Sequence, residues 1–102
     1  MVRIIFSKTA KTDLKEIVDY IKRDSANYAA LEKRKIMSAI DRLAIQPEIG
    51  TVLSTISIKY RKMVFGNYLV IYTIISPEQI NILSVHHHAR SFTNNPAFKD
   101  DD

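Results

Sequence analysis

The sequence has no cysteine and only two glycines among its 102 residues. Without cysteine, the chain cannot form disulfides, thiolate-ligated metal sites or a cysteine nucleophile. Two glycines are too few for a phosphate-binding loop of the Walker or dinucleotide type. The G-x-S-x-G pattern of a hydrolase nucleophile is missing as well. These absences exclude several large classes of enzyme.

Long apolar runs are also missing from the sequence. No stretch approaches the roughly 20 apolar residues that cross a bilayer. The apolar stretch at the N-terminus is much shorter than the core of a secretory signal peptide, and charged residues follow it at once. We therefore expect a cytoplasmic protein that does not act on membranes.

The residues that are present suit one basic domain. Hydrophobic residues make up 46% of the chain, which is enough for a single core at this length. The net charge is +4 even though the chain ends in the acids Asp100 to Asp102. We expect one domain over residues 1–92 and a flexible acidic tail over 93–102. The basic body suggests an anionic partner, such as nucleic acid, the ribosome or an acidic protein segment, although many soluble proteins carry a similar charge.

Two amphipathic helices are predicted in the first half of the chain. Ser7 or Thr9 can cap the first, and Ser25 or Asn27 can cap the second, which ends before Pro47. The short connection between them predicts an antiparallel hairpin. Residues 32–35 should be exposed on the second helix. The apolar positions that recur at helical spacing are Ala10, Leu14, Ile17, Val18 and Ile21, followed by Ala29, Ala30, Ile36, Ile40, Leu43 and Ala44.

Strands are predicted at residues 2–6, 58–65, 68–75 and 79–87. Turn signals at Gly66-Asn67 and at 76–78 make the last three an antiparallel meander. The strand at 68–75 is apolar on both faces, so it should be central and covered on each side. The helical hairpin must bury its apolar stripe against this sheet. The predicted fold class is α+β: an N-terminal strand and an antiparallel helical hairpin packed on an antiparallel β-sheet.

The triplet His86 to His88 is the first candidate site. Strand geometry places His86 and His88 on one face and His87 on the other. A catalytic zinc ion needs three protein ligands, so we predict no metal and no cofactor. His88 or His86 could instead act as a general acid or base beside Arg90, whose guanidinium suits phosphate. The simpler interpretation is that one histidine is packed and the others are solvated.

The second candidate site is the basic group Lys59, Arg61 and Lys62. Lys59 and Arg61 should share a face of their strand, with Lys62 on the other. Tyr60 and Tyr68 could stack on bases, but tyrosines of this kind more often belong to the core, as Tyr72 should. Two interpretations of this basic group remain: it contacts an acidic or phosphate partner, or it is simply solvated.

Several segments, in this order, resemble the ParE/RelE superfamily of bacterial toxins, and the ParE branch more closely. The resemblance spans residues 2–92. Its segments are Ala10-x-x-Asp13-Leu14-x-x-Ile17-x-x-Tyr20-Ile21, Leu43-x-x-x-Pro47-x-x-Gly50, Arg61-Lys62-Met63, Tyr68-Leu69-Val70-Ile71-Tyr72, and Ile80-x-Ile82-x-x-Val85-x-His87-x-x-Arg90.

The resemblance implies the toxin of a type II toxin–antitoxin module, bound by a ParD-like cognate antitoxin that alone would contact DNA. ParE-type toxins poison DNA gyrase, whereas RelE-type toxins cut messenger RNA in the ribosome; the shared fold does not choose between them. RelE-type nucleases carry arginines at the positions of Leu69 and His88. Because this chain lacks both arginines, the resemblance favours a non-enzymatic gyrase inhibitor.

Two alternatives stay open at the sequence level. One is a ribosome-dependent messenger-RNA endonuclease that uses Arg61, His88 and Arg90. The other is a remnant without toxicity that still binds the antitoxin. In every case, the residues predicted to contact a partner are Lys59, Arg61, Lys62, His86, His88 and Arg90.

Overall fold

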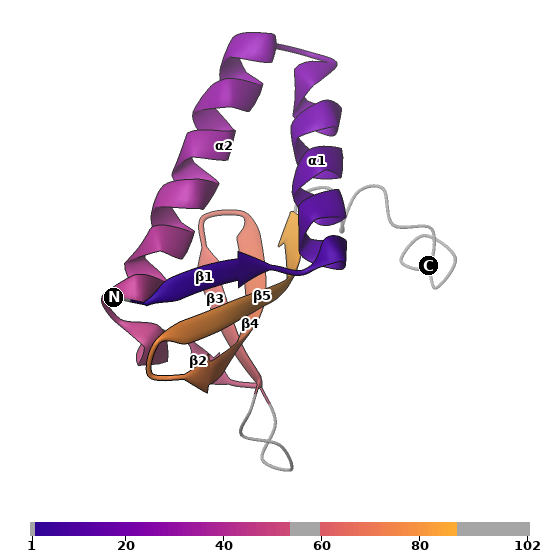
Figure 1. Ribbon diagram of the computed structural model, residues 1–102. Coiled ribbons are helices and arrows are strands. Elements are labelled where there is room, and N and C mark those ends of the chain that lie inside the picture. Colours follow the sequence, from indigo (N-terminus) through magenta and orange to yellow (C-terminus); the bar gives the residue numbers. More distant parts are fainter. Residues whose placement is uncertain (1, 54–59, 88–102) are drawn as a thin grey trace, which may run out of the picture.

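The computed structural model describes residues 2–53 and 60–87. Within these residues the chain forms a five-stranded sheet with strand order β1-β5-β4-β3-β2. Two helices, α1 and α2, lie on one side of it (Figure 1). The strands are β1 (Arg3–Phe6), β2 (Thr51–Val52), β3 (Tyr60–Phe65), β4 (Tyr68–Ser76) and β5 (Gln79–His87).

The predicted meander from β3 to β5 is confirmed. Phe65 pairs with Tyr68, so Gly66 and Asn67 close the first hairpin, and Gly66 takes the positive φ of 54° that such a turn favours. β1 joins this meander by pairing with β5 in parallel, a pairing on which the sequence analysis made no prediction. The sheet is therefore mixed, since the side-chain pattern of a strand does not encode the direction of its neighbour.

Serine caps begin both helices. Ser7 Oγ accepts a hydrogen bond from the Ala10 amide at 3.0 Å and opens α1 (Lys8–Lys22). Ser25 Oγ does the same for the Tyr28 amide at 3.1 Å and opens α2 (Ala26–Asp41). α2 ends at Asp41, in agreement with the prediction that the second helix ends before Pro47. The chain continues in two short 3-10 turns, η1 (Arg42–Ala44) and η2 (Pro47–Ile49).

The core lies between the helical hairpin and one face of the sheet. Its largest fully buried side chains come from both layers: Ile36, Ile40, Leu43, Val70, Tyr72, Ile80 and Ile82. The helices cover only one face of β4, so the prediction that both its faces are covered is wrong for the described residues. No helix in the described part of the chain is long and apolar enough to cross a membrane.

Two predictions about α2 are wrong. Ala30 is exposed, and Glu32 is buried with 7% of its surface accessible. The buried face of α2 runs through Ala29, Glu32 and Ile36, so a carboxylate occupies a position that the helical period assigns to the core.

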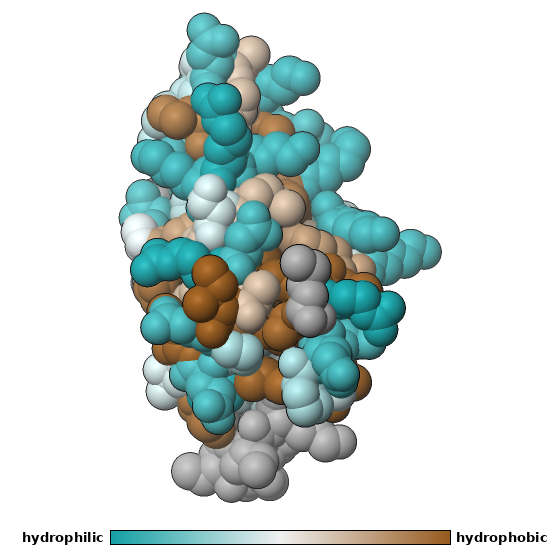
Figure 2. Space-filling view, turned by 60° about the vertical axis from the view of Figure 1, so that its left-hand side comes forward, coloured by the Kyte–Doolittle hydropathy of each residue, from teal (hydrophilic) through white to brown (hydrophobic). Residues whose placement is uncertain are grey.

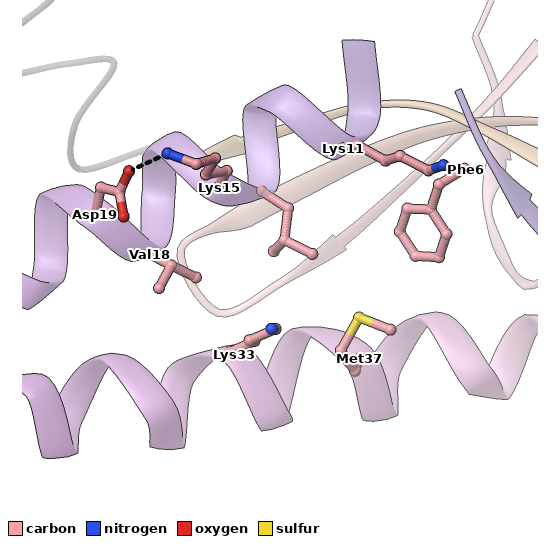
Figure 3. Close-up of a pocket in the computed structure, with 8 residues that line it drawn as sticks. Phe6, Lys11, Lys15, Val18, Asp19, Lys33 and Met37 are labelled. Carbon is pink, nitrogen blue, oxygen red and sulfur yellow. Dashed lines mark hydrogen bonds and ion pairs between the residues drawn. The ribbon is translucent and has the colours of Figure 1, made fainter. Parts of the chain in front are cut away.

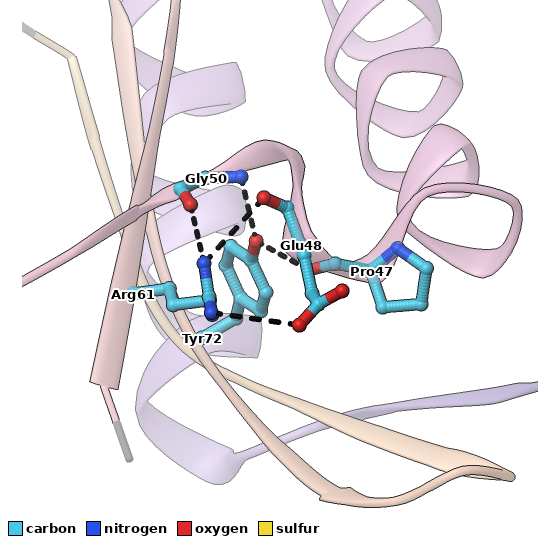
Figure 4. Close-up of polar contacts among 5 residues, drawn as sticks. All are labelled: Pro47, Glu48, Gly50, Arg61 and Tyr72. Carbon is cyan, nitrogen blue, oxygen red and sulfur yellow. Dashed lines mark hydrogen bonds and ion pairs between the residues drawn. The ribbon is translucent and has the colours of Figure 1, made fainter. Parts of the chain in front are cut away.

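A tyrosine and an arginine hold the loop that links η2 to β2 (Figure 4). The Tyr72 hydroxyl accepts a hydrogen bond from the Gly50 amide at 2.9 Å and donates one to the Pro47 carbonyl at 2.7 Å. Arg61 donates to the Gly50 carbonyl at 2.8 Å and to the Glu48 carbonyl at 3.4 Å. A Cβ on Gly50 would lie 2.6 Å from the Lys62 carbonyl oxygen, so only glycine fits there.

We expect Tyr72→Phe to destabilise the protein by about 1–3 kcal/mol, because it leaves the Gly50 amide and the Pro47 carbonyl without their partner. Denaturant unfolding measures this change. Tyr60→Phe is the matched control, since Tyr60 is 41% exposed; equal stability of the two variants would contradict the role of the Tyr72 hydroxyl.

Candidate partner-binding site

A buried polar cluster joins α2 to the ends of β4 and β5. The Tyr68 hydroxyl donates a hydrogen bond to Glu32 Oε1 at 2.7 Å, and Lys35 Nζ lies 3.0 Å from Glu32 Oε2. The His87 ring stacks on Tyr68 with centroids 4.9 Å apart. The ring of Tyr20 in α1 also lies near His87, in an edge-type arrangement with the two ring centroids 6.5 Å apart. The cluster therefore fixes both helices against the end of the sheet.

The charge of Glu32 is stabilised within this cluster. Burial by itself opposes ionisation, but the Tyr68 hydroxyl, the Lys35 ammonium and the nearby His87 together hold the pKa of Glu32 below its ordinary value. Burial and the hydrogen bond to Glu32 raise the pKa of Tyr68, so its hydroxyl stays protonated and donates. Sequence reasoning missed this cluster, because Glu32 is adjacent in sequence to three exposed basic residues.

The two described histidines lie on opposite faces of β5, as predicted. His87 is packed on the helix-facing side, whereas His86 is exposed on the other side, with its Nε2 3.2 Å from Ser84 Oγ. Predicted residues Lys59, His88 and Arg90 lie outside the described residues. No group of three metal-ligating side chains occurs in the part of the chain that the structure describes.

The basic residues of β3 also separate onto two faces. Arg61 lies on the helix-facing side, where its guanidinium holds the η2–β2 loop, with its Nη2 3.9 Å from the Glu48 carboxylate. Lys62 is exposed on the opposite side. The structure thus brings Lys62 and His86, but not Arg61, to the uncovered face of the sheet.

The strand register arranges this uncovered face in rows. Val64 pairs with Leu69, which pairs with His86; Lys62 pairs with Ile71 in the next row. Val64 is 56% exposed, and Leu69 and Ile71 are half-buried. We call this surface the open face. Its centre is apolar, formed by Val64, Leu69 and Ile71, and the charged or polar side chains beside it are Lys62 and His86.

A groove of about 390 Å³ lies between α1 and α2 (Figure 3). Its apolar floor comes from β1, α1 and α2, and charged side chains form its rim. The floor residues are Phe6, Leu14, Val18 and Met37, and the rim residues are Lys11, Lys15, Asp19 and Lys33. We call it the hairpin groove.

Lysines dominate the rim of the hairpin groove. Lys15 pairs with Asp19 at 3.0 Å, whereas Lys11 and Lys33 have no acidic partner within the described residues. One feature of the sequence points to this groove: Leu14 and Val18 lie at the margin of the apolar stripe of α1, next to these lysines. An apolar floor with a basic rim suits an acidic amphipathic segment.

Comparison with known proteins identifies the family. A family model described as "ParE toxin of type II toxin-antitoxin system, parDE" matches residues 4–92. The chain belongs to the ParE toxin family. "Toxin ParE1" from two strains of Mycobacterium tuberculosis, CDC 1551 / Oshkosh and ATCC 25618 / H37Rv, is 31% identical over 86 residues, which cover 83% of this chain and 88% of the relative.

A solved structure shares the ParE fold. "Chromosomal ParDE TA system from P. aeruginosa" matches with a TM-score of 0.70 at 16% identity, over 85% of this chain and 96% of that chain. At this identity the match shows the fold alone. The resemblance to ParE toxins inferred from the sequence is therefore confirmed by the family match and, for the α+β architecture, by the structure.

We expect the stability of this ParE-family protein to fall in acid as Glu32 is protonated. The folded state lowers the pKa of Glu32. The contribution of Glu32 to stability is therefore complete above its ordinary pKa of 4.5, and it is lost as the pH falls through the folded-state value. Glu32→Gln should cost about 1–3 kcal/mol at neutral pH and reduce the acid dependence.

Denaturant unfolding between about pH 7 and pH 3 measures both effects. Glu16→Gln, which changes an exposed glutamate of α1, is the control and should behave like the unmodified protein. An unchanged pH profile in Glu32→Gln would contradict the stabilising role of this carboxylate.

Proposed function

We propose that this ParE-family chain is the toxin of a cytoplasmic toxin–antitoxin module, which inhibits DNA gyrase by binding and is neutralised by a ParD-like antitoxin. The observation that carries the non-enzymatic part is the row of the open face formed by Val64, Leu69 and His86. Leu69 lies in this row between Val64 and His86, and the sequence resemblance assigns to this position the arginine of RelE-type nucleases.

The position of Arg61 supports the same proposal. A ribonuclease must stabilise the charge that develops on the phosphate, which requires cations aimed at the reacting group. Arg61 instead donates to two loop carbonyls on the helix-facing side, away from Lys62 and His86. The guanidinium thus supports the fold rather than a phosphate site.

The hairpin groove is the proposed main contact for the antitoxin. Helix-in-groove recognition uses apolar anchors from one face of an amphipathic helix. The floor of the groove offers such contacts, and Lys11 and Lys33 at its rim would attract acidic side chains. An antitoxin segment that is unfolded when free and orders in the groove fits this chemistry.

A supercoiling assay tests the toxin activity. Purified protein in excess over gyrase should abolish supercoiling, and prior addition of the cognate antitoxin should restore it. The Leu69→Ala variant tests the open face, because it removes apolar contact area there and leaves the core between the sheet and the helices unchanged. Full supercoiling with excess unmodified protein would contradict gyrase inhibition.

Transcript mapping separates the alternative mechanisms. During induced expression we expect growth arrest with intact transcript ends. Codon-phased cuts would favour the ribosome-dependent endonuclease instead. Normal growth with a folded, antitoxin-binding protein would indicate a remnant without toxicity.

Charge reversal in the hairpin groove tests the antitoxin contact. We expect Lys11→Glu combined with Lys33→Glu to weaken antitoxin binding by about tenfold or more and to reduce its salt dependence. Lys8→Glu combined with Arg34→Glu is the matched control, because it makes the same charge change at exposed helix positions outside the groove. Titration calorimetry at two salt concentrations measures both pairs; equal losses would contradict a specific role for the groove.

A further inference from the structure

The hairpin groove sets two requirements for any segment that fills it. Val18 of α1 and Met37 of α2 point into the groove from opposite sides (Figure 3), so an occupant needs an apolar side chain. Lys11 and Lys33 at the rim have no acidic partner within residues 2–53 and 60–87, so an occupant gains from carboxylates close to that side chain.

The chain itself carries a sequence of this kind after β5. Residues 88–102 lie outside the described residues. Within them Phe98 is followed, after one lysine, by Asp100, Asp101 and Asp102. No other stretch of the sequence has even two adjacent acids. A phenylalanine ring offers a large apolar surface, so residues 98–102 combine one apolar anchor with three carboxylates.

The end of β5 brings the start of this segment close to the groove. α1 packs against β5, and the ring of His87, the last described residue, lies 6.5 Å from the ring of Tyr20 in α1. Tyr20 follows Asp19, which lines the groove. The stretch from His87 to Phe98 spans up to roughly 35 Å when extended, whereas a helix with its side chains is roughly 10–12 Å thick. Phe98 can therefore pass around α1 and reach the groove.

We propose that residues 98–102 of this chain occupy the hairpin groove reversibly when no antitoxin is bound. Phe98 would contact the apolar floor, and the three aspartates would meet Lys11 and Lys33. A short tether gives such a segment an effective concentration in the millimolar range, so even a weak contact keeps the groove filled for much of the time. The inference rests on the proposed function in one respect, since the antitoxin would displace this segment from the same groove.

Occupancy by this segment would cover apolar surface in the free protein. On the face shown in Figure 2, the upper part of the molecule is mostly hydrophilic, and hydrophobic side chains gather lower down. The floor of the groove includes Phe6 of β1, so the groove extends down to the sheet. Exposed apolar surface of this kind promotes association with other proteins. A tethered segment that yields only to a better-fitting partner would limit such contacts.

The groove suits this segment better than the open face does. The groove places Lys11 and Lys33 around one apolar pocket, whereas Lys62 is the lysine that the described strands present on the open face. The same segment from a second copy of the chain is a weaker competitor. It would match the tethered segment only at protein concentrations that approach the millimolar range.

Methyl NMR on the full chain tests the inference, because an aromatic ring shifts the signals of methyl groups beside it. Met37 lines the groove, and Met63 is buried in the core, so one spectrum reports on both places. Phe98→Ala should move the Met37 signal and leave the Met63 signal in place. Phe92→Ala removes the other phenylalanine of the segment and is the control, which should leave both signals in place.

Two results of this experiment would overturn the inference. The first is an unchanged Met37 signal in Phe98→Ala. The second is a Met37 shift that grows with protein concentration in the unmodified chain, because the segment of a second copy would then fill the groove.

Antitoxin affinity gives a second measurement, with the purified full-length antitoxin as the probe. If the segment fills the groove in about two thirds of the molecules, it raises the apparent dissociation constant of the antitoxin about threefold. Neutralising all three aspartates, by Asp100→Asn, Asp101→Asn and Asp102→Asn together, should therefore tighten antitoxin binding about threefold. The matched control combines Glu16→Gln, Asp24→Asn and Glu78→Gln, which remove the same charge at exposed positions outside the groove.

The two variants separate occupancy of the groove from a general effect of charge. Equal affinities of both variants for the antitoxin would overturn the inference. Failure of the unmodified protein to bind antitoxin at all would instead contradict the proposed function, and the Met37 signal would still decide whether the segment fills the groove.

Discussion

One helical hairpin covers one face of the sheet, and the rest of the structure follows from this arrangement. The helices bury their apolar stripes against Val70, Tyr72, Ile80 and neighbouring side chains, which removes the apolar surface of both layers from water. The opposite face keeps its apolar centre at Val64 and Leu69 accessible. The same packing that stabilises the fold therefore leaves an exposed, partly apolar surface, of the kind that often marks interaction sites.

Two tyrosines of β4 fix the positions of neighbouring elements through their hydroxyl groups. Tyr68 and Tyr72 both point toward the helices, yet each hydroxyl holds a different element. Tyr68 fixes α2 through Glu32, and Tyr72 fixes the loop before β2 through Gly50 and Pro47. A tyrosine ring adds apolar contact while its hydroxyl satisfies a buried polar group, so each residue combines packing with orientation.

The candidate functional surfaces are all places where this packing ends. The hairpin groove lies between the helices, and the open face lies on the side of the sheet away from the helices. Each combines apolar side chains with lysine or arginine. Such surfaces suit acidic protein segments better than small substrates. The ParE fold itself does not decide the target, because fold and function are separable.

Local patterns in the amino-acid sequence were enough to predict the secondary-structure elements and their order. Helical spacing, serine caps and the Gly66-Asn67 turn act over a few residues, so α1, α2 and the meander could be predicted, as could the opposite faces of His86 and His87. Three features could be read only from the folded chain: the parallel pairing of β1 with β5, the burial of Glu32 and the contacts of Arg61 with the η2–β2 loop. Glu32 and Tyr68 are 36 positions apart. A charged residue is expected to be exposed when no partner for it is evident in the sequence. The partner of Glu32 is Tyr68, which comes close to it only when the chain folds.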